Sequence, residues 1–241
     1  MDEITASPEI SRKENKMGVM PINKLIITMS LPMMISMLVQ ALYNIVDSIF
    51  VAQISENALT SVSLAFSMQQ LMLAVSTGTG VGVNALLSKR LGMKDFEGAN
   101  KVANTGVFLA FCSYLVFLVV GLTAVRPFMM MQNSDPEIVQ GGVEYLSVVL
   151  IFSFGLFTQI IMERLVQSTG KTMIAMVTQT IGAVINIIFD PILIFGLLGF
   201  PKLGITGAAI ATVAGQIVAA ILGIILNQTR NKEITVNPLR Y

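Results

Sequence analysis

Two aspartates lie inside long apolar stretches of the sequence, where a carboxylate is expensive. Asp47 follows Tyr43 and Asn44 near the end of one stretch, and Asp190 follows Asn186 near the end of a later one. A charge at membrane depth costs roughly 2.5–3.5 kcal/mol or more, so such a residue is a candidate for function. The polar residues one helical turn earlier lie on the same helix faces as the aspartates. The pattern indicates a site for a proton or a small cation.

Each of these two stretches also contains a proline. Pro191 directly follows Asp190, and Pro32 lies in the earlier stretch. Proline cannot donate to the carbonyl four residues back, so we expect both prolines to bend their helices and to free the carbonyls of Ile187 and Thr28. Freed carbonyls beside carboxylates are suitable ligands for Na⁺ or partners for a protonated acid.

A third acid, Glu163, has two interpretations. It stands next to Arg164 near the inner end of another apolar stretch. It could belong to the functional site, or its side chain could snorkel to the cytoplasmic interface. The sequence leaves both interpretations open.

The elements that must position these acids are membrane-spanning helices. A spanning helix needs about 20 mostly apolar residues, and irregular backbone cannot face lipid. We therefore predict an all-α fold, a polytopic membrane bundle of about six transmembrane helices. The six segments that qualify are roughly 24–52, 60–87, 101–124, 143–165, 173–196 and 205–227.

Within these helices the two aspartates are expected at one level. Asp47 and Asp190 each lie five or six residues before the outer end of their segments, roughly 8–9 Å deep at 1.5 Å per residue. Thr212 reaches a similar level about seven residues into the last segment. The alternative is that each aspartate has only a structural role, forming a hydrogen bond between two helices. Two aspartates at the same depth make this structural interpretation less favoured.

Composition supports the membrane assignment and excludes several functions. Of 241 residues, 54% are hydrophobic and 12% are charged, whereas a soluble protein has roughly 25% charged residues. A net charge of +1 argues against a nucleic-acid partner. With no His and one Cys, the chain lacks His-based metal sites, Cys–His nucleophiles and an intrachain disulfide. We therefore expect a protein that is not an enzyme.

The distribution of basic residues predicts the orientation. Among the fifteen Lys and Arg residues, only Arg126 and Lys202 fall in the links that would face outward. Because basic residues concentrate on the cytoplasmic side, both termini are expected there, in the inner (plasma) membrane. The predicted domains are a polar cytoplasmic segment 1–23, a transmembrane lobe 24–228 and a cytoplasmic tail 229–241.

Six short motifs, in order along the chain, carry a family resemblance. The motifs are Ser30-Leu31-Pro32, the run from Tyr43 to Val51, Ser88-Lys89-Arg90-Leu91-Gly92, Gln167-Ser168-Thr169-Gly170-Lys171, the run from Asn186 to Gly196, and Gly204-Ile205-Thr206-Gly207-Ala208-Ala209. With these motifs the sequence resembles, from about residue 20 to 228, the N-terminal half of multidrug and toxic compound extrusion (MATE) transporters, in particular the bacterial multidrug exporters. The run from Asn186 to Gly196 is the most specific of the six motifs.

The resemblance implies an antiporter that exports amphipathic, often cationic, compounds in exchange for H⁺ or Na⁺. It implies no cofactor other than this coupling ion. The family's cation site matches Asp47, Asn186, Asp190 and Thr212 here, and the first three would hold Na⁺ where Na⁺ rather than H⁺ is the coupling ion. Glu163 matches an acidic position of some multidrug members. The expected partners are the lipid bilayer, small drug-like substrates and a second six-helix lobe.

The chain departs from the family in length, and two other functions stay open. Family members have about twelve helices in two lobes, whereas this sequence stops at Tyr241. A truncated product is the first expectation, and a fragment or a half that pairs with a second copy are the alternatives. The other functions are a lipid-linked oligosaccharide flippase, disfavoured because no basic residue lies well inside a span, and a non-transporting membrane scaffold.

Overall fold

The computed structural model describes residues 16–231 and 233–234, and all regular structure within them is helical. The predicted segment 1–23 lies outside these residues up to residue 15, as do residue 232 and residues 235–241 of the predicted tail. The elements are α1 Lys16–Val19, α2 Ile22–Ala52, α3 Glu56–Gly92, α4 Phe96–Thr123, α5 Val125–Gln132, α6 Pro136–Ile151, α7 Phe154–Ser168, α8 Thr172–Phe195, the 3₁₀ turn η1 Leu197–Gly199, and α9 Ile205–Arg230.

The helices have the length and composition of membrane spans. Within the described residues, α2, α3, α4, α8 and α9 are each long and apolar enough to cross a membrane, and α6 with α7 would form a sixth, bent span. Because a membrane lacks water to satisfy the backbone, continuous helices are the stable form of such segments. The prediction of an all-α bundle with about six spans is confirmed.

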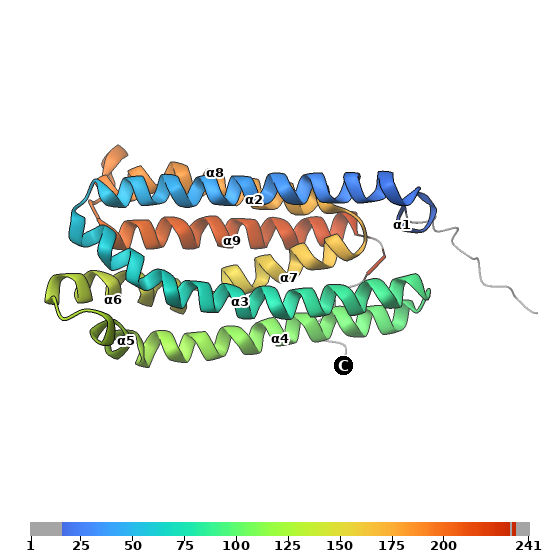
Figure 1. Cartoon of the computed structure of the whole chain (residues 1–241), viewed down its shortest axis with the longest axis horizontal. Helices are drawn as coiled ribbons and strands as arrows, with labels where there is room; N and C mark the ends of the chain where they lie inside the picture. Colours follow the sequence, from blue (N-terminus) through green and yellow to red (C-terminus); the bar gives the residue numbers. More distant parts are fainter. Residues whose placement is uncertain (1–15, 232, 235–241) are drawn as a thin grey trace, which may run out of the picture.

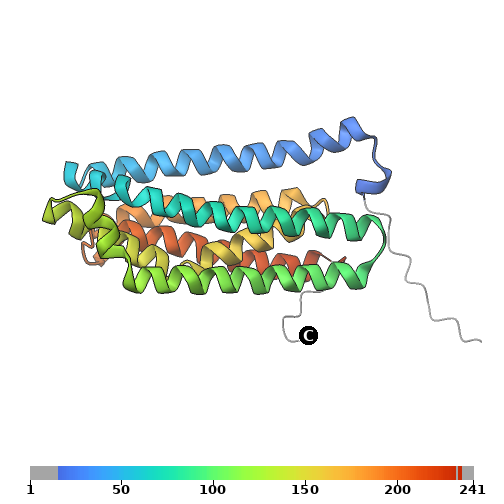
Figure 2. The ribbon, with the colours of Figure 1, turned by 60° about the horizontal axis from the view of Figure 1, so that its bottom comes forward.

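The long helices lie side by side in a bundle (Figure 1). Helix α8 packs against α9 and α2, while α3 packs against α4, α6 and α7. Helix α7 also packs against α9 and so joins the two groups. Helix α2 lies at the edge of the bundle (Figure 2), and most of its apolar side chains are exposed.

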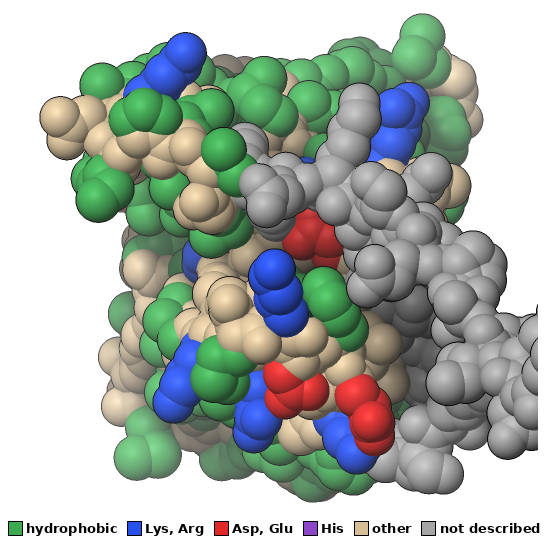
Figure 3. Space-filling model, turned by 90° about the vertical axis from the view of Figure 1, so that its right-hand side faces the viewer, with side chains coloured by type: hydrophobic (Ala, Val, Ile, Leu, Met, Phe, Trp, Pro, Cys, Tyr) green, Lys and Arg blue, Asp and Glu red, His purple; other side chains and the backbone are tan. Residues whose placement is uncertain are grey.

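The ends of the bundle differ in their charged residues. The start of α2, the α3–α4 turn and the end of α9 lie at the right-hand end of Figure 1, which Figure 3 views face on with its Lys, Arg, Asp and Glu side chains. Lys89 and Arg90 lie in the last turn of α3, and Lys94 lies in the α3–α4 turn that follows. Arg126 and Lys202 belong to α5 and to the α8–α9 connection, at the opposite end. The chain therefore alternates between the ends as the basic residues indicate.

Two predicted links are largely helical, and the predicted boundaries there are wrong. Helix α3 continues through Lys89 and Arg90, so only residues 93–95 separate it from α4. Asp95 begins α4 as its N-cap, because its side chain accepts a hydrogen bond from Gly98 N at 2.9 Å. Helix α6 begins at Pro136 rather than near residue 143, after the N-cap Asp135.

The fourth predicted span, 143–165, is not one straight helix. Helices α6 and α7 form a broken pair, bent by 48°. No proline lies at the break, but Ser153 and Gly155 do, and such small residues are common at kinks. The bend lets Gly155 lie against Ile217 of α9, where an added Cβ would come within 2.9 Å of the Ile217 side chain.

Glycines bring α8 and α9 into close contact. A Cβ added at Gly215 would lie 2.6 Å from the carbonyl oxygen of Gly182, and one added at Gly207 would lie 2.6 Å from the carbonyl oxygen of Leu193. Small residues allow membrane helices to approach until their backbones touch. This contact fixes the relative position of the two helices that carry Asp190 and Thr212.

Candidate functional site: a buried carboxyl pair

Asp47 and Asp190 face each other from α2 and α8. Their carboxyl groups lie within hydrogen-bonding reach of one another, and the side chains are 8% and 0% exposed. Each lies five residues before the last residue of its helix, Ala52 and Phe195. The prediction that the two acids lie at one level is therefore confirmed, and the structure adds that they face each other.

In the described part of the chain, the carboxyl pair has unpaired acceptor oxygens and no salt bridge to a basic side chain. The Oδ1 atoms of Asp47 and Asp190 are both buried without a hydrogen-bond partner in the described part of the chain. Burial is the largest influence on each carboxyl group and the other carboxyl group is the next, and among the described residues no basic side chain contributes. Two buried carboxyl groups within hydrogen-bonding reach cannot both stay ionised without compensation, so a shared proton or a bound cation must neutralise the pair.

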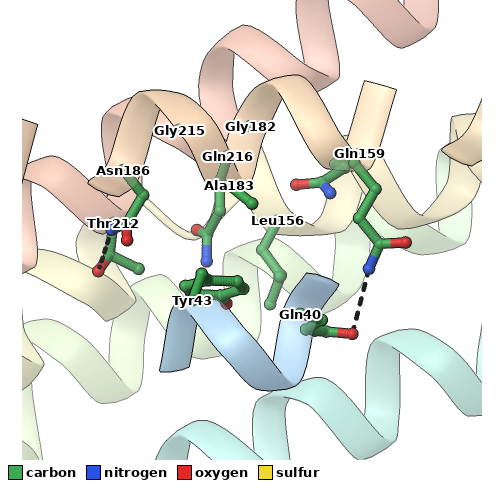
Figure 4. Close-up of a pocket in the computed structure, with 11 residues that line it drawn as sticks. Gln40, Tyr43, Leu156, Gln159, Gly182, Ala183, Asn186, Thr212, Gly215 and Gln216 are labelled. Carbon is green, nitrogen blue, oxygen red and sulfur yellow. Dashed lines mark hydrogen bonds between the residues drawn. The ribbon is translucent and has the colours of Figure 1, made fainter. Parts of the chain in front are cut away.

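Asn186 and Thr212 complete the centre. Asn186 is buried one turn before Asp190, as predicted, and Thr212 is buried on α9. Hydrogen bonding favours the amide orientation in which Asn186 Nδ2 donates to Asp190 Oδ2 at 3.1 Å and Oδ1 accepts from Thr212 N and Oγ1 at 3.1 and 3.2 Å. Figure 4 draws the opposite orientation, with Asn186 Nδ2 donating to Thr212 Oγ1 at 3.2 Å. In both orientations Asn186 links α8 to α9.

Tyr145 of α6 joins this centre and was missed by the sequence analysis. It is buried, its hydroxyl accepts a hydrogen bond from Gln69 Nε2 at 3.2 Å, and it lies within hydrogen-bonding reach of Thr212. The predicted span began at residue 143, which placed Tyr145 at the membrane boundary. Because α6 begins at Pro136, Tyr145 lies more than two turns inside the helix instead.

Tyr43 faces a small polar cavity next to the centre. The cavity has a volume of about 40 Å³ and lies between α2, α7, α8 and α9 (Figure 4). Gln40 also lines it and accepts a hydrogen bond from Gln179 Nε2 at 3.1 Å, which ties α2 to α8. The cavity walls are Gln40, Tyr43, Leu156, Gln159, Gln179, Gly182, Ala183, Asn186, Thr212, Gly215 and Gln216.

Asn44 does not join the carboxyl pair, so this predicted addition to the site is wrong. Residues three and four positions before Asp47 flank it on either side of the helix face, and α8 covers the side of Tyr43. Asn44 is exposed instead and lines an open groove of about 520 Å³ between α2 and α3. Ile45, Ser48, Leu59 and Phe66 are among the groove's other residues.

Glu163 lies apart from the pair but is buried, which contradicts the interpretation that it snorkels to the interface. Its side chain is 9% exposed in α7 and accepts a hydrogen bond from Gln159 Nε2 at 3.0 Å. Arg164 beside it donates to Gln167 Oε1 at 2.9 Å. Gln159 therefore connects Glu163 to the wall of the polar cavity.

The two prolines lie inside continuous helices. Helix α2 continues through Pro32 and helix α8 continues through Pro191, which directly follows Asp190. Proline removes one intrahelical donor at each position. The bending assigned to both prolines stays a prediction.

The donor set suits a hard monovalent cation or a proton. Carboxylate and hydroxyl oxygens are ligands that hard cations prefer, and Asp47, Asp190 and Thr212 supply them; Asn186 turns its amide oxygen toward Asp190 only in the orientation that Figure 4 draws. In the described part of the chain no group of three or more Asp, Glu, His and Cys residues could hold a metal ion. The arrangement is therefore a pair of acids with polar neighbours.

Comparisons with known proteins agree with this fold. The family model described as MatE matches residues 32–192. The chain is 27% identical over 202 residues to an FAD transporter of Shewanella oneidensis, covering 84% of this chain and 45% of that protein. It is 31% identical over 166 residues to a probable multidrug resistance protein NorM of Bacillus cereus, covering 68% and 37%.

A solved structure extends the likeness to three dimensions. A MOP superfamily transporter from Pyrococcus furiosus superimposes with a TM-score of 0.82 at 29% identity, covering 89% of this chain and 47% of that one. The fold and the comparisons together identify the chain as a multi-pass membrane protein that resembles one lobe of a transporter. The chain belongs to the MatE family and corresponds to the N-terminal lobe of a MATE transporter. It spans less than half the length of the curated relatives named above.

Proposed function

We propose that this chain is one lobe of a cation-coupled exporter of amphipathic, often cationic, compounds. The observation that carries the proposal is the pair of facing carboxyl groups, Asp47 and Asp190, each with a buried oxygen that has no partner in the described residues. H⁺ or Na⁺ would neutralise the pair; Na⁺ would be held by Asp47, Asp190 and Asn186, with the Asn186 amide turned to the orientation in which its Nδ2 donates to Thr212. Thr212 supports Asn186 from α9.

Ion binding would act on α2, because this helix packs mainly against α8. With the pair neutralised, α2 and α8 can hold their carboxyl groups together without repulsion. Loss of the ion would drive the two helices apart and favour bending at Pro32 and Pro191. Since α2 also forms one wall of the open groove, its movement would change the surface available to a substrate.

The substrate would bind along this groove and the exposed face of α2. The groove walls combine Ile45, Ile49 and Phe66 with the polar groups of Asn44 and Ser48, and no charged residue lines it. An amphipathic compound fits such a mixed surface. A second six-helix lobe would cover it from the other side, which agrees with the share of the relatives' length that this chain spans.

Orientation follows from the charged end of the bundle. The end that carries Lys89, Arg90, Lys94 and Lys171 is proposed to face the cytoplasm, with the protein in the plasma membrane and both termini inside. Asp47 and Asp190 then lie nearer the outer face. The open groove also lies there, because Ala52 and Leu59 flank the outer α2–α3 turn.

Anionic substrates fit this lobe less well. One relative is named as an FAD transporter, and an oligosaccharide flippase would also have to hold phosphate groups. Arg and Lys are the residues that bind phosphate, and none lines the groove. Cationic or neutral amphipathic compounds are therefore favoured.

Dye efflux tests the proposal. Cells that express the chain with a complementary second lobe should accumulate less of a fluorescent cationic dye than cells without it. Collapse of the gradient of the coupling ion, H⁺ or Na⁺, should abolish this difference in dye accumulation. Dye efflux from cells that express only this chain shows whether two copies of the lobe are enough for transport. Dye accumulation that is the same with and without the chain, and that does not respond to collapse of an ion gradient, would support the scaffold alternative and contradict the proposal.

A further inference from the structure

Arg126 and Lys202 are exceptions to the distribution of basic residues along the chain. Both are exposed at the end of the bundle opposite Lys89, Arg90 and Lys94 (Figure 1). Neither forms a salt bridge with a described residue, and neither lines the open groove. The proposed coupling mechanism therefore assigns no role to these two cations.

Arg126 lies in α5, a short helix with one buried face and one exposed face. Val125 and Met129 are buried against the bundle, where α5 packs on α6 and α4. Met130 and Met131 are 60% and 87% exposed. Helix α5 therefore shows two large apolar side chains beside one exposed cation.

Lys202 lies in the α8–α9 connection, a compact protrusion that also exposes apolar side chains. A backbone hydrogen bond from Leu203 N to Leu193 O at 3.0 Å closes its base. Leu198 and Phe200 are 83% and 49% exposed. Leu198 has a φ of 57°, a left-handed conformation that glycine adopts more readily. The connection therefore repeats the combination seen in α5.

Both protrusions lie at the level of lipid headgroups. Helix α4 has 28 residues and is about 42 Å long, close to the roughly 40–45 Å of a bilayer with its headgroups. Helix α8 has 24 residues and is about 36 Å long, which exceeds a hydrocarbon core of about 30 Å. Helix α5 directly follows α4 and the connection directly follows α8, at the same end of the bundle (Figure 1).

The aromatic residues that usually hold a membrane protein at this level are missing. Trp and Tyr normally gather at the membrane–water interface. The chain has no Trp, and Tyr43, Tyr114 and Tyr145 each lie nine residues inside the outer ends of α2, α4 and α6. Tyr241 lies outside the described residues. The outer interface therefore needs another kind of anchor.

The exposed face of α8 indicates that lipid surrounds its outer end. Every exposed residue of α8 is apolar, whereas the groove between α2 and α3 contains Asn44 and Ser48. Polar side chains in a span normally face protein or a water-filled space, so a wholly apolar face suits acyl chains. The exposed residues of α8 are Met173, Val177, Ile181, Val184, Ile188 and Phe189.

We propose that α5 and the α8–α9 connection are two interfacial anchors that bind phospholipid at the outer face of the membrane. Met131 and Leu198 enter the boundary between headgroups and acyl chains, together with their exposed apolar neighbours. Arg126 and Lys202 bind the lipid phosphates, because a guanidinium or ammonium group is the natural partner of a phosphate. This surface is separate from the proposed coupling site and does not depend on it.

Single tryptophans test the anchors, because the chain has no Trp of its own. Met131→Trp and Phe200→Trp are made in the full chain, and Ser134→Trp, at an exposed position of the α5–α6 connection, is the matched control. Each variant is placed in nanodiscs of phosphatidylcholine and phosphatidylglycerol brominated near the headgroup. The emission of the two anchor variants should shift to shorter wavelength and lose most of its intensity, and that of Ser134→Trp should do neither.

Charge removal tests the phosphate contacts. Arg126→Gln is added to Met131→Trp, and Lys202→Gln is added to Phe200→Trp, with only the phosphatidylglycerol brominated. The share of phosphatidylglycerol that gives half-maximal quenching should rise about five-fold, which corresponds to about 1 kcal/mol for one basic residue near an anionic surface. Lys94→Gln, at the opposite end of the bundle, should leave this share unchanged.

Two results would overturn the anchors. One is quenching of Met131→Trp and Phe200→Trp that is no stronger than that of Ser134→Trp. The other is loss of quenching when a complementary second lobe is reconstituted with the chain, because protein rather than lipid would then cover these residues. A half-maximal share that is the same with and without Arg126→Gln and Lys202→Gln would overturn the phosphate contacts. None of these measurements involves the coupling ion, so their outcome is distinct from that of the proposed function.

Discussion

The α8–α9 interface and the α3–α4 hairpin contain the same two residue types in opposite surroundings. In the first, Asp190 is fully enclosed and Gly215 touches the backbone of the neighbouring helix. In the second, Asp95 lies at the open turn, where it accepts hydrogen bonds from Gly98 N and Arg90, and Gly82 has open space around it. An aspartate is costly in the first place and stabilising in the second, because only Asp95 has a backbone donor, a guanidinium and solvent beside it.

The pKa of Asp95 reflects this difference. The backbone donor Gly98 N, followed by the Arg90 guanidinium, lowers the pKa of Asp95 below its ordinary value. The hairpin therefore gains from an ionised carboxylate. Among the described residues Asn186 is the side chain that donates to Asp190, which agrees with the proposal that Asp190 exchanges a proton or cation rather than holding a fixed charge.

The largest expected effect comes from removing the enclosed charge. Asp190→Asn in an active assembly should reduce coupled efflux to the level of cells without the transporter, because the ion site loses a ligand that no neighbour replaces. Asp95→Asn is the matched control, since asparagine also caps helices, and it should keep efflux close to wild type. Dye efflux at equal membrane expression compares them. Normal efflux by Asp190→Asn would remove this residue from the mechanism.

A smaller effect, on the free energy of unfolding, is expected from replacing Gly215 or Gly82 with alanine. Gly215→Ala places its Cβ 2.6 Å from a backbone oxygen of α8, so the helices must separate, and we expect a loss of about 1–3 kcal/mol in unfolding free energy. Gly82→Ala meets no atom within 4 Å and should be neutral or stabilise by about 0.5–1 kcal/mol through helix propensity. Denaturant titration of both variants in detergent measures this. Equal stabilities would show that the close α8–α9 contact is not required.

The smallest effect concerns the exposed carboxylate. Asp95→Ala removes the cap of α4 and the bond to Arg90, so the melting temperature should fall slightly near neutral pH. Because the pKa of Asp95 is lowered in the folded chain, its contribution is present above the ordinary pKa of aspartate and disappears as the pH falls through the lowered value. Melting curves of wild type and variant should therefore converge in acid. A difference that grows on acidification would contradict the assigned cap.

The helix count and the level of the acids could be predicted because both depend on hydrophobic length. Five or six residues before the end of a span place Asp47 and Asp190 at one depth, whatever the details of packing. Thr212 followed from the same reasoning. The number of spans and the depth of these residues follow from the length of each apolar stretch in the bilayer, which can be read from the sequence alone.

Other parts of the site depend on which helix lies beside which, and the sequence does not record that. Asn44 and Tyr43 are equally near Asp47 along α2, and only the position of α8 separates them. Tyr145 was missed because the start of α6 was misplaced, although the cap Asp135 followed by Pro136 was a usable signal. The break between α6 and α7 had only the weak signal of Ser153 and Gly155.

We propose above that Asp47 and Asp190 bind the coupling ion as a pair. Equilibrium infrared titration of the purified chain, with and without Na⁺, measures this directly through the protonated carboxyl signal. We expect one signal that disappears in Asp190→Asn, changes in Asp47→Asn and is insensitive to Asp95→Asn. A signal that is identical in wild type, Asp47→Asn and Asp190→Asn at every pH would contradict it.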